Sequence, residues 1–92
     1  MAQIIQNQFV GNDTGIELFN NSSFCGQNEV DKSRKDGIQV VNNNEEMQVR
    51  PKLKNNKITS SKSNGILVTG RYSNPSILCN TVETNKKAGV KL

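Results

Sequence analysis

The sequence contains no histidine and no tryptophan, and only one tyrosine and three phenylalanines among its 92 residues. Because histidine is the commonest general base in enzymes, its absence removes many catalytic mechanisms. No spacing of cysteine and histidine typical of a metal site occurs either. Few aromatic rings are available to stack on bases, and no nucleic-acid-binding motif is present. We therefore expect no nucleic-acid partner.

Acidic residues are also scarce, with eight aspartates and glutamates in total. Glycoside hydrolysis needs two facing carboxylates, and the three aspartates, Asp13, Asp31 and Asp36, do not pair by their spacing. The sequence has no phosphate-binding loop and no acidic calcium cluster. These absences predict a protein that is not an enzyme and that has no catalytic residues, no metal and no cofactor.

Long apolar runs are missing as well. No stretch is long enough to span a membrane, and no basic and apolar signal peptide precedes the first repeat described below. We expect no membrane partner and a cytoplasmic or nuclear location. Low hydropathy (mean −0.64) with abundant Asn, Ser and Lys would ordinarily indicate disorder, but an internal repeat argues against it.

The repeat consists of an Asn-x-apolar unit followed by a Gly-apolar-x-apolar unit. The glycines of the four copies are Gly15, Gly37, Gly65 and Gly89. The matching asparagines are Asn7, Asn28, Asn56 and Asn80, which precede the glycine by eight residues in the first copy and nine in the others. Pro51 and Pro75 occupy one shared position. Four copies in register favour a repeat protein.

The apolar residues of each copy alternate with a period of two and are mostly β-branched, which indicates strands and not helices. Leucine is too rare for a leucine-rich repeat. We therefore predict an all-β fold, a right-handed parallel β-helix (solenoid) of about four coils. The expected inward rows are Ile4/Cys25/Leu53/Ile77, Phe9/Val30/Ile58/Val82, Ile16/Ile38/Ile66/Val90 and Leu18/Val40/Val68/Leu92.

Polar rows are expected at the corners. The repeated asparagines should form a ladder at a corner where they adopt left-handed backbone. Asn12, Ser33, Ser61 and Asn85 should form a second corner. The repeated glycines are expected in a turn that needs positive φ, and the two prolines at the start of strands. Stacking would place Cys25 and Cys79 two coils apart, about 10 Å, so we expect two free thiols.

The single repeat domain would divide into coils at about residues 2–22, 23–50, 51–74 and 75–92. Both ends would expose strand edges, which are templates for self-association. The favoured explanation is that the chain is a fragment of a longer β-helix. End-to-end self-association is the alternative.

Five cations fall in the turns just before the glycines: Arg34, Lys35, Lys62, Lys86 and Lys87. Stacked coils would align them along one edge, with Asp13 in their place in the first coil. This alignment predicts either a solvated turn or a surface for an acidic protein partner. The segment Val41 to Arg50, with Glu45 and Glu46 near its tip, lengthens the second coil. The loop Asn42 to Gln48 within it is a second candidate binding loop.

Two units, PKLKNNKITSSKSNGILV and PSILCNTVETNKKAGVKL, resemble the β-helix repeats of F-box-only protein 11 and its relatives. The resemblance extends over nearly the whole chain, but copper-maturation periplasmic proteins and other β-helix proteins share the pattern. In the F-box family the β-helix holds substrates for ubiquitin conjugation, which implies a substrate-binding part of a ligase adaptor. No F-box lies in these residues. Two functions stay open: a non-catalytic protein-binding scaffold, and a fragment of a carbohydrate-active or surface β-helix protein.

Overall fold

A computed structural model describes residues 3–20, 22–43, 48–70 and 73–91, and the regular structure within these ranges is entirely β-strand. The first two coils contain β1 (Gln3–Ile5), β2 (Gln8–Val10), β3 (Ile16–Phe19), β4 (Phe24–Gly26), β5 (Glu29–Asp31) and β6 (Ile38–Val41). The next two contain β7 (Lys52–Lys54), β8 (Lys57–Thr59), β9 (Ile66–Thr69), β10 (Ser76–Leu78), β11 (Thr81–Glu83) and β12 (Val90–Lys91). Each repeat copy therefore supplies three short strands.

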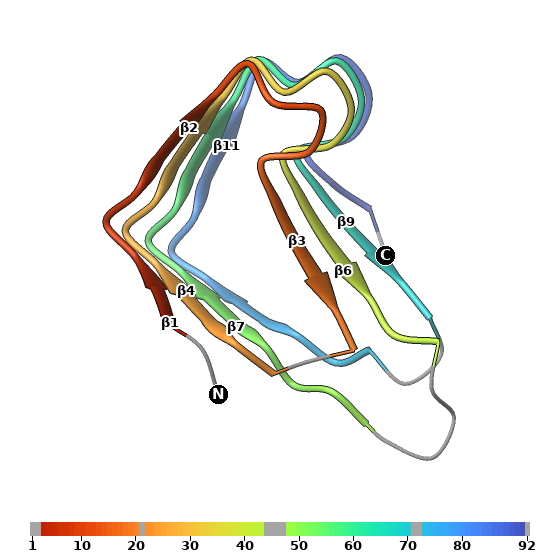
Figure 1. Ribbon diagram of the computed structural model, residues 1–92. Helices are drawn as coiled ribbons and strands as arrows, with labels where there is room; N and C mark the ends of the chain where they lie inside the picture. The colour runs from red at the N-terminus through yellow and green to blue at the C-terminus, as the bar shows by residue number, and fades with distance from the viewer. Residues whose placement is uncertain (1–2, 21, 44–47, 71–72, 92) are drawn as a thin grey trace.

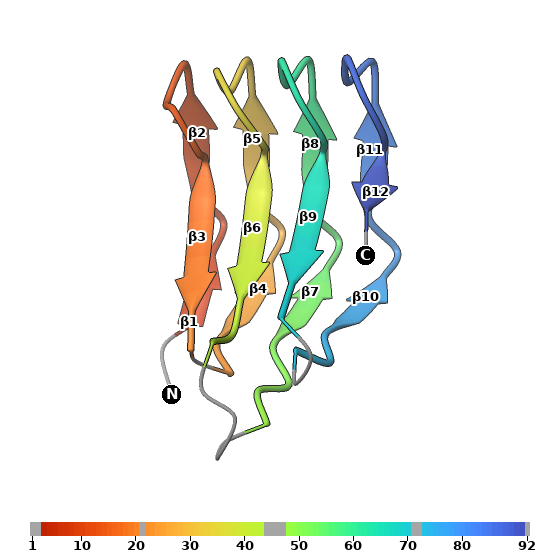
Figure 2. The ribbon, with the colours of Figure 1, turned by 90° about the vertical axis from the view of Figure 1, so that its right-hand side faces the viewer.

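The strands form three parallel four-stranded sheets, ordered β1-β4-β7-β10, β2-β5-β8-β11 and β3-β6-β9-β12. Each sheet takes one strand from every repeat copy, so the copies lie in a stack (Figure 2). Seen along the stack, the three sheets form the three sides of each coil (Figure 1). The chain runs clockwise while it recedes from the viewer, so the solenoid is right-handed.

The core consists of the inward rows that the sequence predicted. Cys25 pairs with Leu53, and Val30 pairs with Ile58, each in parallel register. All four of these side chains are 0% exposed. Along β3, β6 and β9 the exposure alternates, so Ile66 is buried while its neighbour Leu67 faces outward. Leu92, predicted to end the fourth row, lies outside the described residues.

The asparagine ladder stands at the corner between the first two sheets and crosses every coil boundary. Asn56 Oδ1 accepts hydrogen bonds from the backbone N and Nδ2 of Asn28, at 3.1 and 3.0 Å. Asn56 Nδ2 donates to Asn80 Oδ1 and to the carbonyl oxygen of Cys25, both at 3.0 Å. Asn7 begins the same pattern with its N–H on Asn28 Oδ1. Each buried amide thereby satisfies its own polar atoms and a backbone group of its neighbour.

One detail of this corner was predicted wrongly. The left-handed residues are not the ladder asparagines but the residues before them: Gln6, Gln27, Asn55 and Cys79, with φ between 54° and 58°. The preceding residue turns the chain, which aims the asparagine side chain into the stack. A second left-handed row follows the second strand of each coil, at Gly11, Lys32, Ser60 and Thr84.

The repeated glycines also differ from the prediction, because none of them has positive φ. Their role is steric. A Cβ on Gly37 would meet the Ile58 side chain and lie 2.7 Å from the carbonyl oxygen of Gly65. Gly15 and Gly65 are crowded in the same way by the next coil. Glycine is therefore required in the first three copies because the turn backbone passes directly over a core side chain, whereas a Cβ on Gly89 would meet Val82 Cγ1 at an ordinary 3.5 Å.

The remaining predictions concern particular residues. Pro51 and Pro75 stand immediately before β7 and β10. Cys25 and Cys79 are both free thiols, and burial raises the pKa of Cys25 to about 11. In the lengthened second coil, residues 44–47, which include Glu45 and Glu46, lie outside the described residues.

Candidate partner-binding ridge

The five predicted cations lie on the turns between the second and third strands of the coils, at the top of Figure 2. We call this set, Arg34, Lys35, Lys62, Lys86 and Lys87, the cation ridge. Backbone hydrogen bonds fix the stacking of these turns. Lys62 N donates to Ser33 O at 2.9 Å, and Lys86 N donates to Ser61 O at 3.0 Å. Neighbouring turns are therefore joined by backbone hydrogen bonds, as neighbouring strands are.

The stacking arranges the cation ridge in two rows. Arg34, Lys62 and Lys86 form the first row, in which neighbours are one coil apart, about 4.8 Å. Lys35 and Lys87 form the second row with Ser63 between them, because Ser63 N donates to Lys35 O and Lys87 N to Ser63 O. All five cations are exposed. The structure thus brings together the residues that the sequence predicted for this surface.

The first coil ends the ridge with an acidic residue, as predicted. The Asp13 carboxylate lies 3.2 Å from Nη1 of Arg34, and these side chains are 68% and 67% exposed, respectively. An ion pair this exposed contributes little to folding stability. Its effect is local, because it partly neutralises the cation nearest the first coil. The ridge is therefore most positive at Lys62, Lys86 and Lys87.

A buried polar pair lies under the ridge and was not predicted. Asp36 Oδ1 accepts hydrogen bonds from the backbone N and Nδ2 of Asn64, at 2.9 and 3.1 Å, and Gln39 Nε2 donates to Asp36 Oδ2 at 2.8 Å. Burial by itself would raise the pKa of Asp36, but the hydrogen bonds from Gln39, Asn64 and Ser63 outweigh it and lower that pKa. The carboxylate therefore ties the second turn to the third. The only sequence signal was a polar residue directly before Gly37 and Gly65.

The second predicted corner lies beside the ridge. Ser33 and Ser61 are buried, and Asn85 Oδ1 accepts a hydrogen bond from Ser61 N at 2.9 Å. Within the described part of the chain, the Ser33 and Ser61 hydroxyls and Asn85 Nδ2 are buried without a hydrogen-bond partner. These atoms carry a desolvation cost. The corner therefore places the ridge turns mainly through backbone hydrogen bonds, with the Asn85 side chain as an additional acceptor.

The three aspartates do not converge on a shared site. Asp13 pairs with Arg34, Asp31 accepts a hydrogen bond from the Thr59 hydroxyl at 2.9 Å, and Asp36 is enclosed by its amide donors. Among residues 3–20, 22–43, 48–70 and 73–91, no group of three or more Cys, Asp or Glu could hold a metal ion. In the same ranges, no helix is long and apolar enough to cross a membrane.

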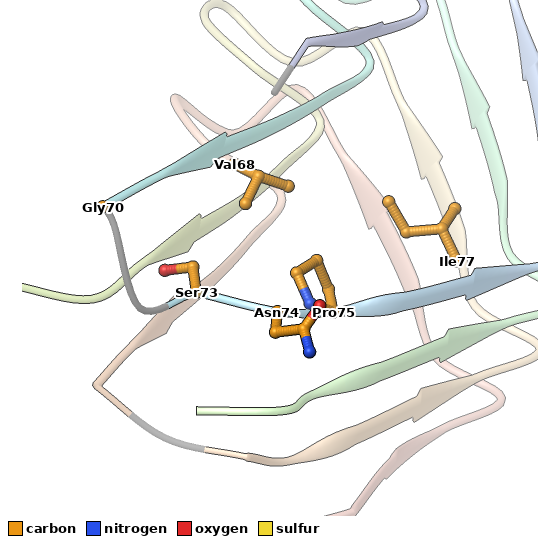
Figure 3. Close-up of a pocket in the computed structure, with 6 residues that line it drawn as sticks. All are labelled: Val68, Gly70, Ser73, Asn74, Pro75 and Ile77. Carbon is orange, nitrogen blue, oxygen red and sulfur yellow. The ribbon is translucent and has the colours of Figure 1, made fainter. Parts of the chain in front are cut away.

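A pocket of about 330 Å³ lies beside the last two coils (Figure 3). It is lined by Val68, Gly70, Ser73, Asn74, Pro75 and Ile77. The lining offers two polar side chains and no ionisable group, so it provides neither a general acid nor a general base. A second pocket, of about 280 Å³, contains Phe24 and Lys54 on the outer face of the first sheet. Neither pocket includes a residue of the cation ridge.

Comparisons of the chain with protein-family models, with curated proteins and with solved structures find no match.

Proposed function

We propose that this chain is a non-catalytic β-solenoid scaffold that binds an acidic segment of a protein partner along the cation ridge. The observation that supports this proposal is the alignment of five exposed cations on turns fixed by inter-coil hydrogen bonds. Flexible loops would lose conformational freedom on binding, whereas stacked turns are already ordered. A preorganised row of positive charge favours an acidic ligand.

The dimensions of the ridge suggest the size of this ligand. From Arg34 to Lys86 the first row extends over two coil spacings, about 10 Å. An extended peptide advances about 3.3 Å per residue, so about three or four residues would lie along the row. Each lysine or arginine forms only a weak ion pair in water. Several together would increase the association rate and would make the affinity fall as salt rises.

The resemblance of the repeats to the F-box-only protein 11 family supports a more specific form of the proposal. In that form, the partner is a protein destined for ubiquitin conjugation, and the chain is the substrate-binding part of a ligase adaptor in the cytoplasm or nucleus. The first test does not depend on this form, because it measures binding of acidic ligands by the ridge itself.

The test compares two variants of equal charge. The ridge variant carries Lys35→Glu, Lys62→Glu, Lys86→Glu and Lys87→Glu. The control carries Arg50→Glu, Lys52→Glu, Lys54→Glu and Lys57→Glu, which are exposed residues at the end of the second coil and in the third coil, away from the ridge. Both are first checked by circular dichroism for native β-structure. Binding of a fluorescent oligoglutamate peptide is then followed by anisotropy at low and at physiological salt.

The proposal expects the intact chain and the control to bind with salt-dependent affinity, and the ridge variant to lose binding at least about tenfold more than the control. Equal losses in the two variants would mean that net charge alone attracts the peptide. That result would leave the ridge as a solvated turn and would overturn the proposal. A pull-down from lysate with the same proteins then identifies natural partners.

A further inference from the structure

The residues directly before the repeated glycines form a column through the stack: Thr14, Asp36, Asn64 and Ala88. Two members of this column belong to the dipeptides Asp36-Gly37 and Asn64-Gly65, and the sequence contains no other Asp-Gly or Asn-Gly. In unstructured chains these are the dipeptides that cyclise most readily, because a following glycine leaves the backbone nitrogen unhindered. The column therefore places two reactive dipeptides in adjacent coils.

The reaction expected at Asn64 is deamidation. The backbone nitrogen of Gly65 loses its proton to the solvent and attacks Cγ of the Asn64 side chain. The new N–Cγ bond closes a cyclic imide, the bond from Cγ to Nδ2 breaks, and Nδ2 takes a proton from water and leaves as ammonia. Water then opens the imide at either of its carbonyls, which gives aspartate or isoaspartate at position 64. Water is the only co-reactant.

In the folded chain both reacting groups are held by neighbouring coils. Asn64 Nδ2 donates to Asp36 Oδ1 at 3.1 Å, and Asn64 Oδ1 accepts a hydrogen bond from Ala88 N at 3.2 Å. The attacking nitrogen is held as well, because Gly65 N donates to Ala88 O at 3.0 Å. Cyclisation requires this nitrogen to turn from the next coil toward its own side chain. The third turn must therefore leave the stack before Asn64 can react.

The fold itself requires the glycine that makes the dipeptide reactive. A Cβ on Gly65 would meet Val82 Cγ1 and would lie 2.7 Å from the carbonyl oxygen of Gly89. No larger residue fits at this position without a shift of the last coil. The reactivity of Asn64-Gly65 in the unfolded chain is therefore a consequence of the close stacking of the turns in the folded one.

The products of deamidation would not fit the stack. An aspartate at position 64 would bring a second carboxylate against that of Asp36, where the Asn64 amide now donates, and both positions are only 5% exposed. Two carboxylates that share a buried site cannot both be charged without a large penalty. An isoaspartate would lengthen the main chain, whose present length is fixed by the bonds from Gly65 N to Ala88 O and from Ile66 N to Gly89 O.

We propose that Asn64-Gly65 is a latent modification site, which deamidates only in chains whose third turn has left the stack and whose product keeps that turn from returning. Opening of the turn becomes irreversible once ammonia has left. The site therefore limits how long the chain survives partial unfolding. This property does not depend on ligand binding by the cation ridge.

The first test compares the folded chain with an unstructured reference. Trypsin cleavage after Lys62 and Arg71 releases residues 63–71, in which Asn64 is the only asparagine. Mass spectrometry of this fragment, after brief digestion, follows deamidation of the intact chain incubated at neutral pH. The reference is a synthetic peptide of residues 63–71, which cannot form the stack.

We expect the synthetic peptide to deamidate at least about tenfold faster than the folded chain, because reaction in the folded chain requires local opening. The same chain in concentrated urea should react as fast as the peptide. Equal rates in the folded chain and the peptide would overturn the proposal. This comparison changes no residue of the cation ridge, so its outcome is independent of the peptide-binding test.

A pair of variants tests the protective contact. Asp36→Ala removes the carboxylate that accepts from Asn64 N and Nδ2, so Asn64 should deamidate faster than in the wild-type chain. Asp13→Ala is the matched control, because Asp13 forms an exposed ion pair with Arg34 in the first two turns. It should leave the rate unchanged. An unchanged rate in a folded Asp36→Ala chain would contradict protection by the stack.

A second pair of variants tests whether the product can return to the stack. Asn64→Asp reproduces one product, and Asn64→Ala is its uncharged control, because both lack the Nδ2 donor to Asp36. In urea titrations at neutral pH, Asn64→Asp should unfold at a lower urea concentration than Asn64→Ala. A midpoint for Asn64→Asp equal to that of wild type would overturn the claim that deamidation keeps the turn from returning.

Discussion

Replacing Asn56 by alanine should be among the most damaging single polar substitutions in this fold. Asn56 is 1% exposed and stands in the middle of the asparagine ladder. Its side chain takes part in four hydrogen bonds, two to Asn28, one to Asn80 and one to the carbonyl oxygen of Cys25. Asn56→Ala removes all four and leaves the buried N–H of Asn28 without its acceptor.

The expected loss in free energy of unfolding follows from these hydrogen bonds. A buried donor left unpaired costs about 1–3 kcal/mol, and each further lost hydrogen bond about 0.5–1.5 kcal/mol. Since Asn28 Nδ2 keeps its bond to Ile4 O, we expect a total loss of about 3–5 kcal/mol. A chain of this length has about 5–14 kcal/mol of stability, so the variant would be close to unfolding.

Asn7 is the matched control, because it occupies the first, exposed position of the same ladder. Its Nδ2 donates to Ile5 O at 3.0 Å, and its contact with Asn28 Oδ1 is long, at 3.4 Å. Asn7→Ala should cost less than about 1 kcal/mol. Urea titrations followed by circular dichroism should show a midpoint about 2 M lower for Asn56→Ala. Comparable midpoint shifts for the two variants would refute the ladder as a source of stability.

Three further predictions follow from the packing and the turns. Ile66→Ala should lower the free energy of unfolding by about 2–5 kcal/mol and Leu67→Ala by much less, in the same urea assay; equal losses would contradict the register. Gly37→Ala should lower the free energy of unfolding by about 1–3 kcal/mol, because its Cβ would crowd the next coil. Gly11 has open space around it but a φ of +71°, so Gly11→Ala should lower it by about 1–2 kcal/mol through backbone strain alone. Only the Gly37 variant should perturb core methyl shifts in NMR spectra. Because the pKa of Asp36 is lowered below its ordinary 3.8, its stabilising contribution is present above that pH and is lost as the pH falls through the lowered value. Asp36→Asn should therefore reduce the loss of stability on acidification, measured by urea titrations at a series of acidic pH values. An unchanged loss would exclude a stabilising role for the Asp36 carboxylate.

The fold could be predicted because every coil repeats the same spacing of apolar residues and asparagines. A row such as Val30 and Ile58 is visible in the sequence as a β-branched residue two positions after an asparagine. The positions of the ridge cations followed from the same alignment of the four repeat copies. These features depend only on the repeat spacing and on the parallel stacking of strands.

Backbone conformation within the turns could not be predicted in the same way. The four left-handed residues before the ladder are of three different types, Gln, Asn and Cys. Residue type alone therefore does not show whether the ladder asparagine or the residue before it is left-handed. Gly37 was expected to need positive φ, but its requirement comes from Ile58 in the next coil, a contact between residues far apart in the sequence. The pairing of Asp36 with Asn64 was missed because the two residues differ in type.

In this fold the four repeat copies stack as parallel strands in one register. The most direct measurement is a set of inter-strand nuclear Overhauser effects from isotope-labelled protein in solution. We expect backbone contacts between Val30 and Ile58 and between Ile38 and Ile66, with the parallel pattern. Contacts shifted by one or more residues, or an antiparallel pattern between these strands, would contradict it.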